Sequence, residues 1–64
     1  MRVYAQLKAR IEAGELAPGA RLPIGLYAGE YDVGRDSVKR ALAMLGTDGL
    51  AERYDGLGWY VAGE

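Results

Sequence analysis

The sequence has 64 residues, 50% of them hydrophobic, and a formal net charge of -1 at pH 7. It contains no Cys and no His, which excludes a disulfide framework and an ordinary structural zinc site. The commonest general base and the most nucleophilic side chain are therefore missing, and a chain this short has little room for a deep pocket. We expect a protein that is not an enzyme and that needs no metal or cofactor.

The chain also lacks the apolar segments of an exported or membrane-spanning protein. Its first residues, MRVYAQLKARIE, are interrupted by charged side chains, and its longest purely apolar run is ALAML. These features favour a cytoplasmic protein. Its length of 64 residues favours one domain over residues 1–64.

The first predicted element is a helix over about residues 3–13. Its apolar face is formed by Tyr4, Leu7 and Ile11, and Arg10 falls off this face, toward solvent. The next segment, GELAPGARLP, begins with a Gly that suits a helix end and contains a Pro-Gly turn signal. A very short strand is expected before its last Pro.

A short second helix is predicted over about residues 25–31, with an apolar face formed by Tyr27, Ala28 and Tyr31. Gly25 and Gly29 oppose this helix, because each costs ~1 kcal/mol relative to Ala in a helix interior. A tight turn over residues 32–34 then leads into a third helix.

The third helix, over about residues 35–47, has the strongest helical periodicity in the chain, with Gly34 as its N-cap. Its periodicity predicts four core residues: Val38, Ala41, Leu42 and Leu45. Residues 50–62 then predict a β-hairpin, because LAERY and WYVA are rich in strand formers and flank DGLG. Tyr54 and Trp59 are expected to stack across its strands.

The net charge hides an uneven distribution along the chain. Residues 1–33 carry equal numbers of basic and acidic side chains, residues 34–47 carry three basic against one acidic, and residues 48–64 carry one basic against four acidic. A positive helix in a slightly acidic protein indicates a local anionic target. Two helices joined by a brief turn, the second one basic and followed by a hairpin, are typical of a winged helix-turn-helix that reads the DNA major groove.

Three stretches carry a family resemblance: YAQLKARIEAGELAPGARLP, VGRDSVKRALAMLGTDGLAER and GLGWYV. Together they resemble the DNA-binding domain of the GntR family of bacterial transcription regulators, over nearly the whole chain. The fold class expected is α+β, mostly α: a three-helix winged helix-turn-helix with a C-terminal β-hairpin as the wing.

The resemblance implies roles for the exposed side of the third helix. Arg35 matches an Arg that contacts guanine or phosphate, which suits a guanidinium facing guanine O6 and N7. Ser37 matches a hydroxyl residue that hydrogen-bonds phosphate or a base, Lys39 matches a DNA-contacting Arg, and Arg40 matches a basic position with a phosphate contact. Asp36 either accepts a bond from cytosine N4 or complements the helix dipole, and the dipole role is favoured.

In the hairpin, Gly56 matches the wing glycine, where the backbone comes close to the minor groove. Arg53 matches a basic strand residue that either contacts DNA or only pairs across the hairpin. The chain also departs from the family: IGLYAGE lacks an Arg that touches DNA, Gly34 replaces Ser or Thr, and Trp59 replaces a small polar residue. Leu57 stands where the family often has Arg, and we expect an exposed loop residue rather than a minor-groove wedge.

The leading hypothesis is sequence-specific binding of double-stranded DNA, on a palindromic operator, to repress or activate transcription. The domain alone is expected to be a monomer, with two copies on half-sites about one helical turn apart. The alternative is a protein-interaction module on the same fold, motivated by the acidic C-terminal segment and the apolar residues Leu57 and Trp59.

Overall fold

Three helices and one β-hairpin follow one another along residues 2–63, the part of the chain that the computed structural model describes. Their bounds are α1 (Arg2–Glu12), α2 (Ile24–Glu30), α3 (Arg35–Thr47), β1 (Ala51–Tyr54) and β2 (Gly58–Val61). This order confirms the predicted fold class. The bounds of α3 are those predicted, whereas α1 and α2 each begin and end one residue earlier. Glu64, one of the four acids of the C-terminal segment, lies outside the described residues.

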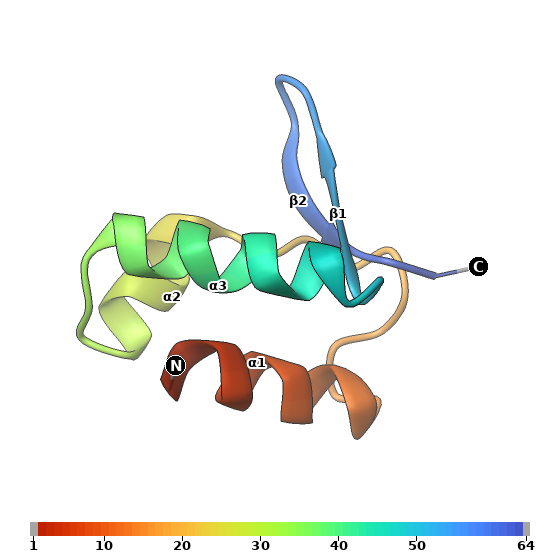
Figure 1. Cartoon of the computed structure of the whole chain (residues 1–64), viewed down its shortest axis with the longest axis horizontal. Helices are drawn as coiled ribbons and strands as arrows, with labels where there is room; N and C mark the ends of the chain where they lie inside the picture. The colour runs from red at the N-terminus through yellow and green to blue at the C-terminus, as the bar shows by residue number, and fades with distance from the viewer. Residues whose placement is uncertain (1, 64) are drawn as a thin grey trace.

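Helix α3 is the centre of the structure. In Figure 1 it crosses the molecule, with α1 along one side and the hairpin rising from its C-terminal end. The four residues predicted for its buried face are all 0% exposed: Val38, Ala41, Leu42 and Leu45. They pack with buried apolar residues from the other elements, namely Val3, Leu7, Leu22, Tyr27, Ala51 and Val61. Because one face of α3 holds the core together, its opposite face is left for solvent or a partner.

The turn between α2 and α3 closes by backbone hydrogen bonds. Asp32 adopts a left-handed conformation with φ of 55°, which Asp tolerates better than most residues. This conformation lets the Val33 N–H donate to the Ala28 carbonyl at 3.0 Å and end α2. Gly34 then takes the extended N-cap conformation of α3, as predicted. The short turn therefore fixes how α2 and α3 sit against each other.

The base of the hairpin is anchored and its tip is free. Residues 21–22, predicted as a very short strand, pair with β2 through an Arg21–Tyr60 bridge and a bond from the Leu22 N–H to the Trp59 carbonyl at 2.9 Å. Beyond the ends of β1 and β2, the Ala62 N–H donates to the Leu50 carbonyl at 3.0 Å. The hydrogen bonding of the hairpin therefore extends over residues 50–62, the range predicted. The tip projects away from the helices (Figure 1).

Arg10 does not point toward solvent, contrary to the prediction. Its guanidinium donates to the carboxylates of Glu15 at 2.9 Å and Glu30 at 3.0 Å, and to the Tyr31 hydroxyl at 2.9 Å. It also lies 5.6 Å from the centroid of the Tyr27 ring. Arg10 therefore ties α1 to α2, because its long side chain reaches partners that helical periodicity alone does not reveal.

The predicted stacking of Tyr54 on Trp59 is also wrong. Tyr54 is paired with Gly58 and its ring contacts Tyr60 edge-on, at a centroid distance of 5.6 Å. The Trp59 ring lies instead on Gly46 of α3, where an added Cβ would be 3.2 Å from the indole. A single-residue difference in register puts these two rings on opposite faces of the hairpin.

Candidate nucleic-acid interface

The first half of α3 presents a charged surface. Arg35, Asp36, Lys39 and Arg40 are all exposed, and Ser37 is half-buried between this surface and the core. The core stripe on the opposite side of the helix explains this arrangement, because it determines which residues face outward. The predicted DNA-binding residues of the third helix are thus brought together on one side.

The three cations of this surface, Arg35, Lys39 and Arg40, have no acidic partner within residues 2–63. Among residues 2–63 the ion pairs are Arg10–Glu15, Arg10–Glu30 and Arg53–Asp55. None of them uses Arg35, Lys39 or Arg40. Their charges are therefore available to an external anion.

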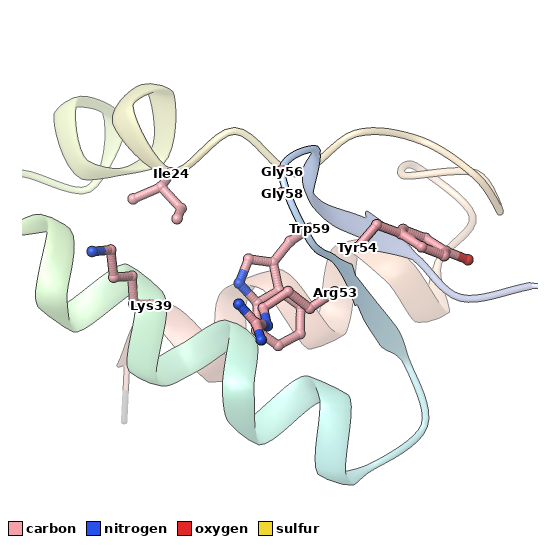
Figure 2. Close-up of a pocket in the computed structure, with 7 residues that line it drawn as sticks. All are labelled: Ile24, Lys39, Arg53, Tyr54, Gly56, Gly58 and Trp59. Atoms are coloured by element: carbon pink, nitrogen blue, oxygen red, sulfur yellow. The ribbon is translucent and has the colours of Figure 1, made fainter.

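A groove opens between α3 and the hairpin. It is lined by Lys39 from α3, by Arg53 and Trp59 from the hairpin, and by Ile24 from the start of α2. Figure 2 shows Lys39 and Trp59 bordering this space from the two elements, whereas the Tyr54 ring points away from it. Two cations along an open groove suit the phosphate backbone of a duplex.

Arg53 pairs with Asp55, just beyond the end of its own strand, rather than with a residue of the opposite strand. Its guanidinium lies 3.3 Å from the Asp55 carboxylate, and the two side chains are 63% and 92% exposed. An ion pair this exposed contributes only ~0–1 kcal/mol and is screened by salt. The pair is therefore weak enough to open when a phosphate competes for Arg53.

The tip of the hairpin is a tight turn built on Gly56. The Leu57 N–H donates to the Tyr54 carbonyl at 3.0 Å, and Gly56 has φ of 78°, the left-handed conformation required at this turn position. No described atom lies within 4 Å of where a Cβ on Gly56 would be. The backbone at the tip is thus open to a close approach, and Leu57 beside it is 63% exposed, as expected.

A second hollow lies beside Arg35 and was not predicted from the sequence. Arg35 lines it together with Gly25 and Leu26 from α2 and Leu57 from the hairpin tip. Leu26 is 60% exposed and contributes apolar surface to this hollow. The signal of this hollow in the sequence is indirect: the segment IGLYAGE lacks an Arg.

The N-terminus of α3 carries its own electrostatic features. Asp36 lies in the first turn, where a carboxylate complements the positive end of the helix. The Ser37 N–H donates to the Gly34 carbonyl at 3.1 Å. The favoured dipole role of Asp36 therefore agrees with its position, and the cytosine contact remains open to it.

Two other kinds of site find no support in residues 2–63. No group of three or more acidic side chains converges there as metal ligands would. Each described helix is too short or too polar to cross a bilayer.

Comparison with known proteins identifies the family. The model of bacterial regulatory proteins of the gntR family matches residues 1–61. The HTH-type transcriptional repressor NagR of Bacillus subtilis (strain 168) is 37% identical over 62 residues, which are 95% of this chain and 26% of NagR. The chain thus spans about a quarter of the length of this relative.

Solved structures agree in fold and in extent. A GntR transcriptional regulator structure from Rhodococcus sp. RHA1 superposes with a TM-score of 0.95 at 32% identity, over 97% of this chain and 30% of that one. A GntR structure from Streptococcus agalactiae gives a TM-score of 0.82 at 31% identity, over 95% of this chain and 30% of that one. The chain therefore belongs to the GntR family of bacterial regulatory proteins, as a winged helix-turn-helix DNA-binding domain and not an enzyme.

Proposed function

We propose that residues 1–64 form one domain that binds double-stranded DNA sequence-specifically in the bacterial cytoplasm. Helix α3 enters the major groove and the hairpin acts as the wing. The observation that carries this proposal is the exposure of Arg35, Lys39 and Arg40 on one helix, none of them in an ion pair within residues 2–63.

The proposed roles on α3 are those that the family resemblance implies, and they are consistent with the chemistry and position of each residue. Arg35, at the first turn, donates to guanine O6 and N7, because a guanidinium matches these two acceptors. Lys39 and Arg40, further along the exposed side, contact the DNA, Arg40 through phosphate. Ser37 donates its hydroxyl to phosphate or a base edge, and Asp36 complements the helix dipole.

The wing contributes a second contact in this proposal. Arg53 exchanges its exposed Asp55 partner for a phosphate at the groove between α3 and the hairpin. Gly56 lets the backbone of the tip come close to the minor groove. Arg53 at the groove, together with Lys39 and Arg40 on α3, then holds the DNA backbone on either side of the bases that Arg35 contacts.

The proposed target is a palindromic operator. The domain alone is a monomer, and two copies occupy half-sites about one helical turn apart. Sedimentation of the free domain as a dimer would contradict the monomer, and a single unpaired half-site among selected sequences would contradict the palindrome.

Selection of bound sequences from a random duplex library tests the proposal directly. We expect an enriched sequence with inverted half-sites, and a log affinity that falls with log salt by ~0.9 per phosphate contacted. Arg35→Ala should cost ~1–3 kcal/mol of discrimination at one base pair. A variant with unchanged affinity and specificity would remove Arg35 from the mechanism.

A protein-interaction module is the second candidate, because two large apolar side chains are exposed beside the proposed DNA surface. Leu26 and Leu57 are 60% and 63% exposed. Titration with a mixed-sequence duplex at low salt separates the two functions. Absence of binding there would favour the protein partner.

A further inference from the structure

The guanidinium of Arg35 lies beside Gly25 of α2, next to the space that a side chain at position 25 would occupy. A Cβ built on Gly25 would lie 3.3 Å from Nη2 and 3.8 Å from Cζ of Arg35. Arg35 belongs to the first turn of α3, so its side chain reaches across the α2–α3 junction. A Cβ at this distance would be tighter than an ordinary contact, so the guanidinium would have to shift by a few tenths of an ångström.

No ion pair within residues 2–63 uses the guanidinium of Arg35. The hollow around Arg35 is lined within residues 2–63 by apolar and basic side chains and by glycine, with no acidic residue among them. Leu26 and Leu57 are its exposed large apolar members. The donors of Arg35 are therefore not used up by a carboxylate, while one side of the group is supported by α2.

Glycine is otherwise a poor choice at this position. Gly25 lies inside α2, where glycine is unfavourable relative to alanine. Its conformation does not require glycine, since its φ is not in the positive range. The space taken by Arg35 supplies a physical reason for glycine here.

We infer that Gly25 is a positioning residue for Arg35, and that discrimination at the base pair read by Arg35 depends on it. This inference rests on the proposed function. A free arginine side chain loses rotamer freedom when it binds, and a group held in place beforehand loses less. Gly25 thus affects specificity without a side chain of its own to offer to the duplex.

Gly25→Val tests the inference, with Gly29→Val as the matched control. Both positions lie in α2, but no described atom lies within 4 Å of a Cβ at Gly29. The milder Gly25→Ala serves as a second variant, since it displaces the guanidinium by only a few tenths of an ångström. Thermal unfolding monitored by circular dichroism establishes that each variant is folded.

The first measurement is NMR relaxation of the Arg35 Nε–Hε group in the free domain. We expect a lower order parameter in Gly25→Val than in the wild type, an intermediate one in Gly25→Ala, and no change in Gly29→Val. Equal values in Gly25→Val and the wild type, or an equal loss in Gly29→Val, would overturn the positioning role.

The second measurement compares library selections and affinities for the enriched duplex and its single-base-pair variants. We expect discrimination at one base pair to fall by about tenfold in Gly25→Val, the scale of a bidentate arginine contact. The salt dependence should stay unchanged, and Gly25→Val should have no further effect in an Arg35→Ala background. An undiminished preference would overturn the inference alone.

A wild type that enriches no sequence would instead overturn the proposed function, and with it the link to specificity. The Nε–Hε measurement would still decide whether Gly25 orients Arg35, because it requires no DNA. The two failures are therefore distinguishable.

Discussion

Arg10 and Lys39 carry the same charge but should serve different purposes, and replacing each by Gln separates them. Arg10 bonds three side chains of the domain, whereas Lys39 is exposed on α3 and enters no ion pair within residues 2–63. We expect Arg10→Gln to reduce the stability of the fold and Lys39→Gln to reduce DNA affinity.

The size of the Arg10 effect follows from its contacts. The part-buried bond to Tyr31 contributes ~1 kcal/mol, and the contact with the Tyr27 ring contributes ~0.5–1 kcal/mol. The carboxylates of Glu15 and Glu30 are 59% and 42% exposed, so each ion pair adds at most ~1 kcal/mol. Because all four contacts share one side chain, they are not additive, and we expect a loss of ~2 kcal/mol.

Thermal unfolding provides the assay. For a domain of this size, that loss lowers Tm by ~8–16 °C, at ~4–8 °C per kcal/mol. Lys39→Gln should leave Tm nearly unchanged and reduce the slope of log affinity against log salt by ~0.9. At a temperature where Arg10→Gln is folded, its salt slope should equal that of the wild type. Equal Tm losses in the two variants, or a smaller salt slope in Arg10→Gln, would refute the division of roles.

Three further changes test the wing and the core. Gly46→Val should destabilise the domain by ~1–3 kcal/mol, because an added Cβ would already be 3.2 Å from the indole of Trp59. The change should also shift the fluorescence of Trp59, the chain's single Trp. Unchanged emission would show that the wing accommodates the added side chain without moving the indole. Asp55→Asn should strengthen binding of a mixed-sequence duplex by up to roughly fivefold at low salt, since it releases Arg53 from a pair worth ~0.2–1 kcal/mol. Fluorescence anisotropy measures this change, and no gain would place Arg53 out of reach of the phosphates. Burial raises the pKa of Tyr27 above its ordinary value of 10.0, so its contribution to stability is complete below pH 10 and is lost as the pH rises through the folded-state pKa. Above pH ~10, we expect the urea midpoint to fall less steeply with pH in Tyr27→Phe than in the wild type. Identical slopes in the two proteins would rule out this contribution of Tyr27.

The helices could be predicted because their apolar residues recur with helical spacing. The four core positions of α3 are all buried, and its bounds are those expected. The turns could also be predicted from the local sequence: Gly19 has φ of 84° in the predicted Pro-Gly turn. Such signals depend on neighbours in the sequence, so one chain is enough to read them.

Contacts between distant residues could not be predicted in the same way. Arg10 lies off the apolar stripe of α1, and its partners Glu30 and Tyr31 are 20 and 21 residues away. The Tyr54–Trp59 pairing assumed that all of DGLG forms the connection, whereas Tyr54 pairs with Gly58. This one-residue slip exchanges the two faces of the strand.

For the candidate interface, the sequence indicated the cations but not the surface around them. Arg40 was expected on the exposed side of α3, Lys39 at its flank and Arg35 nearer the apolar stripe, and all three are exposed. The contact between Arg35 and Gly25 joins the starts of two helices, so it depends on the α2–α3 turn. Sequence analysis could identify Gly25 only as an unfavourable residue in a helix.

The wing of this domain is held by packing more than by charge. The indole of Trp59 lies on Gly46 of α3, which couples the direction of the hairpin to the recognition helix. At the tip, Arg53 shares its charge with Asp55, and the most exposed apolar side chain is Leu57. Surface charges are screened beyond ~8 Å at physiological salt, so a nearly neutral tip adds little long-range attraction. Under the proposed function, helix α3 therefore supplies most of the electrostatic attraction to a duplex, and the wing acts on the duplex through shape and position.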